Sequence, residues 1–526
     1  MLAGCASTSS SKGVVTTTTA STAAVSATTQ AGATTSAGAT TSASAPAPAA
    51  SGGKVTIGLD GEPPTMDPAA NSLSLANGSI YGAVFETLIR ATPTKPLEPL
   101  LLESMPAESA DRLSWTLKLR KGITFHDGVA FDGTAVKFNL QRQKVSVFNG
   151  ASLLLLNDIV VDPADPLTVK LTLSKPWTAL PTVLSGVDGI MISPKSGAGG
   201  KSVARNPIGT GPYKFTSWTA GQQMEFARFD GYWGAQKAPA GSLIFKFVPI
   251  EAARVAAFGA GELDAYTTIV ESAANEAKAK GAQVSAPPPT GYGMVMLNTS
   301  APPFDDVRVR QAMEISYDRD AITKAYGGQN YADYSSSPFI KDSEWWVAPA
   351  EAPRYDLTKA KQLIADYGKP VKFTLLSLKG SQELEDATRA TVEFWKQAGM
   401  DVQLQILADL STYVTDVITG AYDAAGWIGG SIGDPDTITY ALFHSGGSSN
   451  YMKYSNPAVD AALDEARGSS DPAVRKKDYA DVQQILRQDE PALITSHGRI
   501  FIVASKKLTG LDPDFFFPSR TVAPTS

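Results

Sequence analysis

The chain has 526 residues, which is too long for one simple hydrophobic core, so two or three domains are expected. Its formal net charge of -6 and sequence pI of about 5.4 exclude the basic footprint of a nucleic-acid-binding protein. No run approaches the roughly 18 consecutive apolar residues of a membrane-spanning helix. There is one cysteine, so no disulfide can form within the chain.

Residues 1–53 differ in composition from the rest. From residue 6 onward they are almost entirely Ala, Thr, Ser, Gly and Val. Such a tract cannot bury enough surface to offset its ordering entropy, so we expect a flexible tether. It follows Leu2-Ala-Gly-Cys5, which is similar to a bacterial lipobox although only four residues precede the cysteine. We expect a lipid on Cys5; the alternative is a generic disordered N-terminus.

The chain from residue 54 to about residue 288 is expected to be rich in strands. Alternation of apolar and polar residues predicts strands near residues 54–60, 115–119, 167–173, 224–226 and 243–247. Asp132 is placed to cap a helix that carries Val136. Residues 206–218 are rich in glycine and proline but lack the Gly-Lys-Ser/Thr ending of a phosphate loop. The block at about 84–204 is predicted to be a sheet-bearing subdomain.

Beyond residue 288, helices and strands alternate, which is typical of an α/β lobe. Helices are predicted at residues 307–326, 357–367, 384–398, 413–419 and 472–490, with another that starts at Pro457, and strands at 371–377, 402–406, 422–427 and 493–505. Glycines after several of these helices are expected to end them. Asn456-Pro457 and Asp471-Pro472 each combine a cap residue with a proline at the first helical position.

Residues 421–437 (AYDAAGWIGGSIGDPDT) form the stretch around which we organise the function. A buried strand runs into a glycine-rich turn, where ligand and main chain can come close. In open α/β domains, ligands lie beyond the carboxyl ends of the strands. The stretch therefore predicts a binding wall made of Trp427, Gly430, Ser431, Asp434 and Asp436. Alternatively, either aspartate only caps the helix that Pro435 begins.

The residue types that carry catalysis or bind metals are not grouped in this sequence. The three histidines, His126, His444 and His497, are widely separated and form no zinc motif. No Gly-x-Ser-x-Gly elbow is present. We therefore expect no enzyme activity, no cofactor and no metal site. His444 lies shortly after residues 421–437, so it is the histidine to test as a ligand or metal contact.

Five sequence segments, in order, resemble a known family. They are LKLRKGITFHDG at 117–128, IGTGPYKF at 208–215, YW at 232–233, FDDVRVRQA at 304–312 with DRDAI at 318–322, and YSNPAVD at 454–460. The chain resembles the extracellular solute-binding proteins of family 5, the peptide, dipeptide and nickel type that feed ABC importers. The resemblance spans nearly all of the chain after Lys54.

The resemblance implies a two-lobed periplasmic-binding-protein-like α/β fold that closes on its ligand. Lobe 1 would comprise residues 54–288 and 495–526, with the extra subdomain inside it, and lobe 2 residues 289–494. It also implies a monomer that works with an ABC permease and its ATPase subunits. The protein would be extracytoplasmic and held at the cell membrane by the lipid on Cys5.

The resemblance also indicates how the site departs from the peptide-binding members. Those members place an aspartate, the partner of the ligand's α-ammonium, where this chain has Ser431 in a loop one residue longer. A serine cannot replace a carboxylate as the partner of a desolvated cation. The nearest counterpart of their carboxylate-binding arginine is Lys379, which could also be an ordinary surface lysine. Tyr292 and Met294 are further candidate ligand contacts, with a core role as the alternative for Met294.

The predicted function is capture of a peptide or peptide-like solute and its delivery to a permease. Three alternatives stay open. A sugar or opine-like solute would use Trp427 and Tyr292 for stacking and hydrogen bonds. A metal chelate would need His444 or another donor. A non-transport cell-envelope regulator with the same fold would need no small ligand.

Overall fold

The computed structural model describes residues 52–70, 75–92, 95–146, 150–197, 201–235, 238–287, 289, 291–326, 337–341, 343–348, 355–380, 382–430, 433–510 and 523–524. Contacts divide the chain into Met1–Pro48 and Ala49–Ser526, and all described residues belong to the second unit. Cys5 and Ser431 lie outside the described residues. Within these ranges, no helix is both long enough and apolar enough to cross a membrane.

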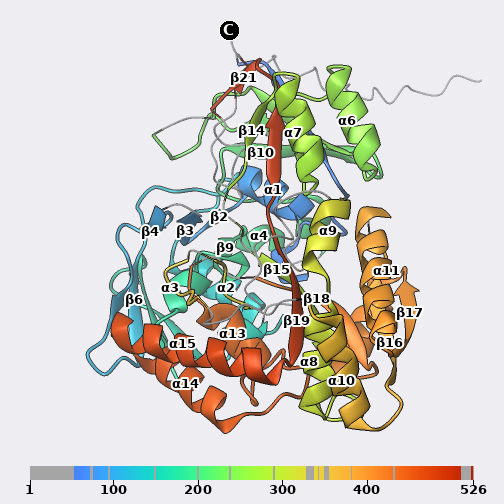
Figure 1. Cartoon of the computed structure of the whole chain (residues 1–526). Coiled ribbons are helices and arrows are strands. Elements are labelled where there is room, and N and C mark those ends of the chain that lie inside the picture. Colours follow the sequence, from blue (N-terminus) through green and yellow to red (C-terminus); the bar gives the residue numbers. More distant parts are fainter. Residues whose placement is uncertain are drawn as a thin grey trace, which may run out of the picture. The chain divides into compact units, whose positions relative to one another are not determined.

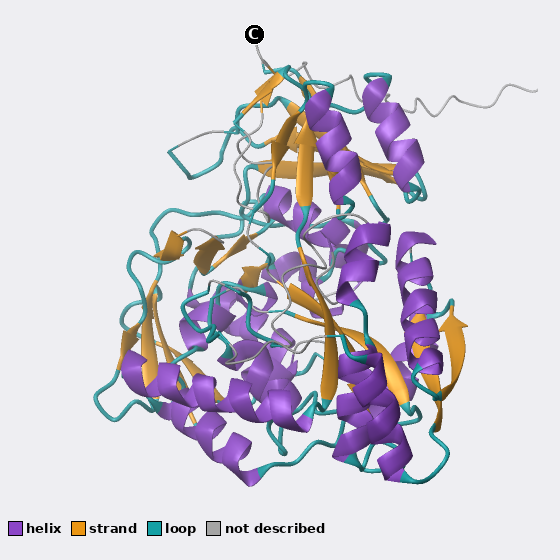
Figure 2. Cartoon of the chain, viewed as in Figure 1, coloured by secondary structure: helices purple, strands orange, loops and turns teal. Residues whose placement is uncertain are grey.

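A seven-stranded sheet has the order β10-β11-β12-β1-β13-β20-β14 (Figures 1 and 2). Its strands are β1 (Lys54–Leu59), β10 (Tyr213–Thr219), β11 (Gln223–Arg228), β12 (Ser242–Phe247), β13 (Ala265–Thr268), β14 (Gln283–Ser285) and β20 (Phe501–Ala504). β1 pairs in parallel with β12 and β13, and β20 pairs antiparallel with β13 and β14. Helices α6 (Glu251–Gly259) and α7 (Glu271–Ala279) follow β12 and β13 along the chain.

A second group of elements lies between β1 and β10 in the sequence. Its largest sheet has the order β5-β6-β8-β7. The strands are β2 (Glu86–Thr87), β3 (Ile89–Thr92), β4 (Lys95–Pro99), β5 (Ala107–Glu108), β6 (Ser114–Lys118), β7 (Leu156–Val161), β8 (Thr168–Leu173) and β9 (Ile190–Met191). The helices are η1 (Pro68–Ala70), α1 (Leu75–Val84), α2 (Gly133–Lys144), η2 (Gly150–Leu153), α3 (Leu180–Val183), η3 (Val187–Gly189), α4 (Pro194–Gly197) and α5 (Lys201–Arg205). One hydrophobic cluster, formed by residues between Leu88 and Met191, fills most of this group.

A five-stranded sheet has the order β17-β16-β18-β15-β19. Its strands are β15 (Gly291–Leu297), β16 (Lys372–Leu378), β17 (Asp401–Leu407), β18 (Ala424–Gly429) and β19 (Ala492–Gly498). The helices are α8 (Val307–Ser316), α9 (Arg319–Tyr326), α10 (Leu357–Tyr367), α11 (Gln382–Gln397), α12 (Leu410–Thr419), α13 (Asp436–Phe443), α14 (Pro457–Gly468) and α15 (Pro472–Asp489). The short strands β21 (Leu508–Thr509) and β22 (Ala523–Pro524) pair near the C-terminus.

The five-stranded sheet has a hydrophobic core on each face, and the alternation in β15 shows why. Met294 and Met296 join one cluster, whereas Val295 and Leu297 join the other. Side chains along a strand point alternately to opposite faces, so a strand buried on both faces must be apolar at consecutive positions. The run from 294 to 297 meets this requirement, and all four side chains are buried.

Several local predictions are confirmed. The strand predicted at residues 54–60 lies at Lys54–Leu59. Asp132 caps α2, because its side chain accepts a hydrogen bond of 3.0 Å from the backbone N–H of Ala135. Such a bond satisfies one of the donors that a helix leaves unpaired in its first turn.

Two predictions of continuous elements are wrong. The single helix expected at 307–326 is two helices, because Tyr317 is extended and the Asp318 side chain accepts from the N–H of Ala321 at the start of α9. The single strand expected at 493–505 is two strands that belong to different sheets, β19 and β20. The chain therefore passes from one sheet to the other at residues 499–500, slightly beyond the predicted return near 495.

Candidate ligand-binding site

One edge of the five-stranded sheet gathers strand ends of the kind at which α/β proteins bind ligands. β16 runs parallel to both β17 and β18, so their carboxyl ends meet at this edge. β15 is antiparallel to β18 and β19, which brings its amino end to the same place: Tyr292 pairs with Gly429, and Gly291 with Gly498. Ligands of open α/β sheets lie beyond the carboxyl ends of the strands. We call this edge the site edge.

Trp427 and Gly430, two of the residues that the sequence analysis proposed for a binding wall, lie at the site edge. Trp427 is half-buried; its ring stacks on Tyr413 with a centroid distance of 6.3 Å and meets the edge of Tyr451 at 5.7 Å. Ile428 is 80% exposed, and Gly430 is exposed as well. The strand therefore ends with an exposed apolar side chain on one face of the sheet and, on the other face, an indole that contacts Tyr413 and Tyr451.

Lys379 adds a positive charge to the site edge. It immediately follows β16, and its backbone N–H donates a hydrogen bond of 2.7 Å to the carbonyl of Leu407 at the end of β17. Its side chain is exposed, and none of the described residues forms an ion pair with its ammonium group. Lys379 can therefore offer its charge to a carboxylate on a ligand.

Asp434 is engaged by the protein itself. Its carboxylate is 2.6 Å from a guanidinium nitrogen of Arg475, and both side chains are buried. The same carboxylate accepts a bond of 3.0 Å from the backbone N–H of Asp436, the first residue of α13. Trp345 donates to the carbonyl of Gly433 at 3.0 Å. These contacts hold the start of α13 in place, so Asp434 caps the helix and pairs with an arginine at the same time.

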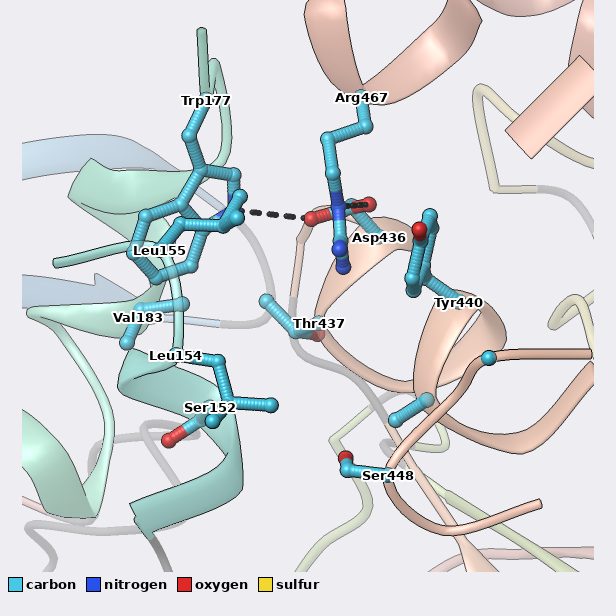
Figure 3. Close-up of a pocket in the computed structure, with 12 residues that line it drawn as sticks. Ser152, Leu154, Leu155, Trp177, Val183, Asp436, Thr437, Tyr440, Ser448 and Arg467 are labelled. Atoms are coloured by element: carbon cyan, nitrogen blue, oxygen red, sulfur yellow. Dashed lines mark hydrogen bonds and ion pairs between the residues drawn. The ribbon is translucent and has the colours of Figure 1, made fainter. Parts of the chain in front are cut away.

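Asp436 is held from two sides, as Figure 3 shows. Its carboxylate accepts 2.8 Å from the Nε–H of Arg467 and 2.9 Å from the indole N–H of Trp177. The side chain is 1% exposed. Burial raises the pKa of Asp436, and the charge of Arg467 partly opposes that rise. Arg467 in turn lies over the ring of Tyr440, 3.2 Å from its centroid.

Tyr292 and Met294 point into the protein rather than outward from the site edge. Each is 2% exposed, and Met294 pairs with Trp427 across β15 and β18. Among the described residues, the buried hydroxyl of Tyr292 has no hydrogen-bond partner, and burial raises the pKa of this phenol. A Cβ atom at residue 429 would lie 2.5 Å from that hydroxyl, so Gly429 is the residue that lets the ring fit beneath β18.

His444 stands at the end of α13 among aromatic and acidic neighbours. Its ring stacks on Tyr440 with centroids 4.2 Å apart, and it lies 3.9 Å from Asp460 and 3.6 Å from Asp464. Its Nδ1 accepts a hydrogen bond of 2.9 Å from the backbone N–H of Gly446, so the neighbouring backbone holds the ring in place. Over the described ranges, no group of three or more His, Cys, Asp or Glu side chains is arranged to hold a metal ion.

A small cavity borders Asp436, Arg467 and Trp177 (Figure 3). Its volume is about 50 Å³, and the other lining residues are Ser152, Leu154, Leu155, Val183, Thr437, Tyr440, Ala441, Gly446 and Ser448. One water molecule needs about 10–15 Å³ of such space. The cavity therefore has room for a few waters and is too small for a peptide.

The sequence analysis missed the arginines that engage the two aspartates and the tryptophan that joins them. One signal was available for Arg475: it precedes Tyr479 by four residues and Val482 by seven, which places it on the buried face of α15. A buried arginine needs an anionic partner. No comparable pattern exists for Trp177, because 259 residues separate it from Asp436.

Comparison with known sequences gives one family. The profile of the bacterial extracellular solute-binding proteins, family 5, middle region, matches residues 96–450. The chain is 31% identical to the glutathione-binding protein GsiB of Pectobacterium atrosepticum over 432 residues, covering 78% of this chain and 82% of the relative. It is 29% identical to GsiB of Escherichia coli O157:H7, covering 85% and 89% of the two chains.

Comparison with solved structures shows the fold. DppA from Helicobacter pylori, in complex with the peptide STSA, has a TM-score of 0.79 at 22% identity, covering 90% of this chain and 98% of that one. AgaA from A. tumefaciens R10, in complex with agropinic acid, has a TM-score of 0.79 at 24% identity, covering 90% of this chain and 99% of that one. NikA from Brucella suis, in complex with Fe(III)-EDTA, has a TM-score of 0.77 at 22% identity, covering 90% of this chain and 99% of that one. The predicted two-lobed α/β fold is confirmed.

Proposed function

Because this chain belongs to the family 5 extracellular solute-binding proteins, which serve ABC importers, we propose that it captures a short acidic peptide of the glutathione class. The observation that carries the choice of ligand is the 31% identity to a glutathione-binding protein over 78% of the chain. The activity is binding without catalysis, and the bound peptide passes to a permease driven by ATPase subunits.

The charges at the site edge support an acidic ligand. Glutathione carries two carboxylates and one ammonium group, and Lys379 offers an exposed cation to one of the carboxylates. An ammonium group could reach Asp434 or Asp436 only by displacing the arginine that each already binds. Breaking a buried ion pair costs about 3–5 kcal/mol. We therefore propose that these aspartates do not anchor the ligand's ammonium group.

Capture follows from closure of the two lobes. We place lobe 2 at residues 289–498 and lobe 1 at residues 54–288 and from about residue 499 onward, because the predicted boundary near 495 would divide β19. Trp427 and Gly430 contribute an apolar wall and accessible main chain at the site edge, and Ser431 leaves the loop without the aspartate of peptide-binding relatives. We also propose a lipid on Cys5, residues 6–53 as the tether, an extracytoplasmic location at the membrane, and a monomeric state.

A thermal-shift panel on the full-length protein tests the ligand class. The panel contains reduced glutathione, dialanine, N-acetyl-dialanine, agropinic acid and a nickel–histidine complex. A ligand at a hundred times its dissociation constant stabilises the folded protein by about 2.7 kcal/mol, which is measurable as a higher melting temperature. We expect glutathione to give the largest shift.

Other results would redirect the proposal. A shift by dialanine but not by its acetylated form would mean that an ammonium group is the anchor. A larger shift with agropinic acid would favour the opine-like alternative, and one with the nickel complex the metal-chelate alternative. No shift with any compound would remove the glutathione class and favour a regulator that needs no small ligand.

A further inference from the structure

The carboxyl end of α14 is hydrogen-bonded to residues that lie far away in the sequence. An α-helix leaves its last four carbonyls without intrahelical partners. Here the backbone N–H of Thr178 donates to the carbonyl of Arg467 at 3.2 Å. The hydroxyl of Thr178 donates to the carbonyl of Ser469 at 2.8 Å. Residues from the block at 84–204 thus complete a helix that packs against α15 in the other half of the chain.

Arg112 adds a charge to the same contact. It lies in the turn between β5 and β6 with a φ of 61°, and its guanidinium donates to the carbonyl of Gly468 and, at 2.6 Å, to the hydroxyl of Thr178. A cation at the carboxyl end of a helix is favourable because the helix dipole is negative there. The left-handed backbone of Arg112 is uncommon for a residue with a long side chain and aims it at the helix end.

The contact continues to the loop that precedes α13. Trp177 is adjacent to Thr178 and is 3% exposed, and its indole donates to Asp436 (Figure 3). Asp436 lies only six residues after Gly430 at the site edge. The position of this loop is therefore linked directly to the position of the block at 84–204.

The chemistry of this contact suits a surface that separates and re-forms. Arg467, the charged partner of Asp436, belongs to the same half of the chain, so separation would leave the ion pair intact. Trp177, the donor that crosses to Asp436, is neutral. Arg112 crosses as a cation, but the acceptors of Arg112 and Thr178 at the end of α14 are backbone carbonyls, and water can also hydrogen-bond to these. The small cavity beside Asp436 shows that the two sides do not interlock fully at this point.

We propose that Arg112, Trp177 and Thr178 form a closure clasp that grips Asp436 and the end of α14 when the two lobes close. The assignment rests on solute capture as proposed above. It gives Asp436 a role in lobe closure that is distinct from contact with the ligand, and it makes the block at 84–204 an active part of closing. Ligand contacts at the site edge and formation of the clasp then stabilise the same closed state.

Distance measurements between two spin labels test the clasp without requiring a known ligand. Full-length protein with Cys5→Ser receives one label through Lys170→Cys and one through Lys476→Cys, both at exposed positions on opposite sides of the contact. Pulsed electron–electron double resonance then measures the distribution of distances between the two labels, and this distribution gives the ratio of closed to open molecules. The comparison is made between otherwise wild-type protein, Trp177→Phe and Arg112→Asn, with and without reduced glutathione. Asparagine tolerates the left-handed backbone at residue 112.

Trp233→Phe is the matched control. Trp233 also donates its indole N–H to a buried carboxylate, Glu86 at 2.7 Å, but both residues precede residue 288. Removing a hydrogen bond to a charged group is expected to lower the closed-to-open ratio by about tenfold in Trp177→Phe. Arg112→Asn should lower it in the same direction, and Trp233→Phe should leave it unchanged.

Three results would overturn the clasp. They are an unchanged ratio in both Trp177→Phe and Arg112→Asn, an equal loss in Trp233→Phe, and a wild-type protein that shows no closed population with or without glutathione. The proposed ligand class can fail while the clasp stands. In that case glutathione would change neither the distance distribution nor the melting temperature of the wild-type protein, while the variants would still differ from the wild-type protein without ligand.

Discussion

Two buried ionisable groups that precede residue 288 have partners of a different kind from two that follow it. Before it, Asp188 and His126 are buried with hydrogen bonds to neutral groups: Asp188 accepts 2.5 Å from Ser152, and His126 donates 2.8 Å to the carbonyl of Gly211. After it, the buried carboxylates of Asp434 and Asp436 each meet an arginine. Burial of a charge without a charged partner shifts its pKa toward the neutral form, whereas a charged partner opposes that shift.

The two kinds of buried ionisable group have different roles in the protein. The arginine pairs hold the start of α13 in place, so their role is geometric. Asp188 and His126 instead make the stability of their region depend on pH. Burial raises the pKa of Asp188 to about 7 and lowers that of His126 to about 4. The two shifts have opposite signs and act over nearly the same pH range.

Arg475→Met should give the largest effect, because it leaves Asp434 buried without its arginine. Breaking a buried ion pair costs about 3–5 kcal/mol of unfolding free energy. Lys477→Met, two residues along the same helix, is the control: its lysine is 72% exposed and pairs with Asp481, and exposed pairs contribute about 0–1 kcal/mol. Urea unfolding of the full-length variants measures both. Equal losses in the two variants would contradict the geometric role of Arg475.

Asp188→Asn should stabilise the protein at neutral and higher pH. The folded-state pKa is above the unfolded value of 3.8, so the wild-type protein loses stability as the pH rises from about 4 to about 7. Each pKa unit corresponds to about 1.4 kcal/mol, which sets the gain at about 4 kcal/mol above pH 7. Asparagine keeps an acceptor for Ser152. Melting temperatures at pH 4 and pH 8 measure the gain, which should vanish at pH 4.

His126→Gln should reduce the stability that the protein loses when the pH falls. The folded-state pKa is below the unfolded value of 6.5, so the wild-type protein loses stability as the pH falls from about 6.5 to about 4. The loss attributable to this group is about 3 kcal/mol at pH 4. Glutamine retains a donor for the carbonyl of Gly211. Urea unfolding from pH 4 to pH 7 should show a smaller loss on acidification in the variant than in the wild-type protein; parallel curves would contradict the assignment.

Local signals were sufficient for most of the fold. Alternating apolar residues located β1 and β8, and Asp132, Asn456 and Asp471 marked the starts of helices because a cap needs only residues next to it. The predictions failed where the tertiary structure divides a continuous sequence pattern between two elements. The apolar run at 493–505 suits one long strand, and only the two separate sheets divide it into β19 and β20.

The candidate site was only partly predictable for the same reason. The position of Trp427 near the end of a strand and of Gly430 just beyond it follows from the sequence pattern. The structure brings Lys379 to the same edge through the parallel pairing of β16 with β18. The role of Asp434 depends on Arg475, which is 41 residues away, and that of Asp436 on Trp177. Partners at such separations leave no periodic trace, so an aspartate that looks free in the sequence can be fully engaged in the fold.

The most direct measurement is calorimetric binding of glutathione and its glycine carboxamide to the wild-type protein and to Lys379→Gln. Lys372→Gln, at the opposite end of the same strand, is the control. If Lys379 binds the glycine carboxylate, amidation should weaken binding to the wild-type protein by about tenfold and to Lys379→Gln hardly at all. Equal losses in both proteins, or no binding of glutathione, would contradict the account.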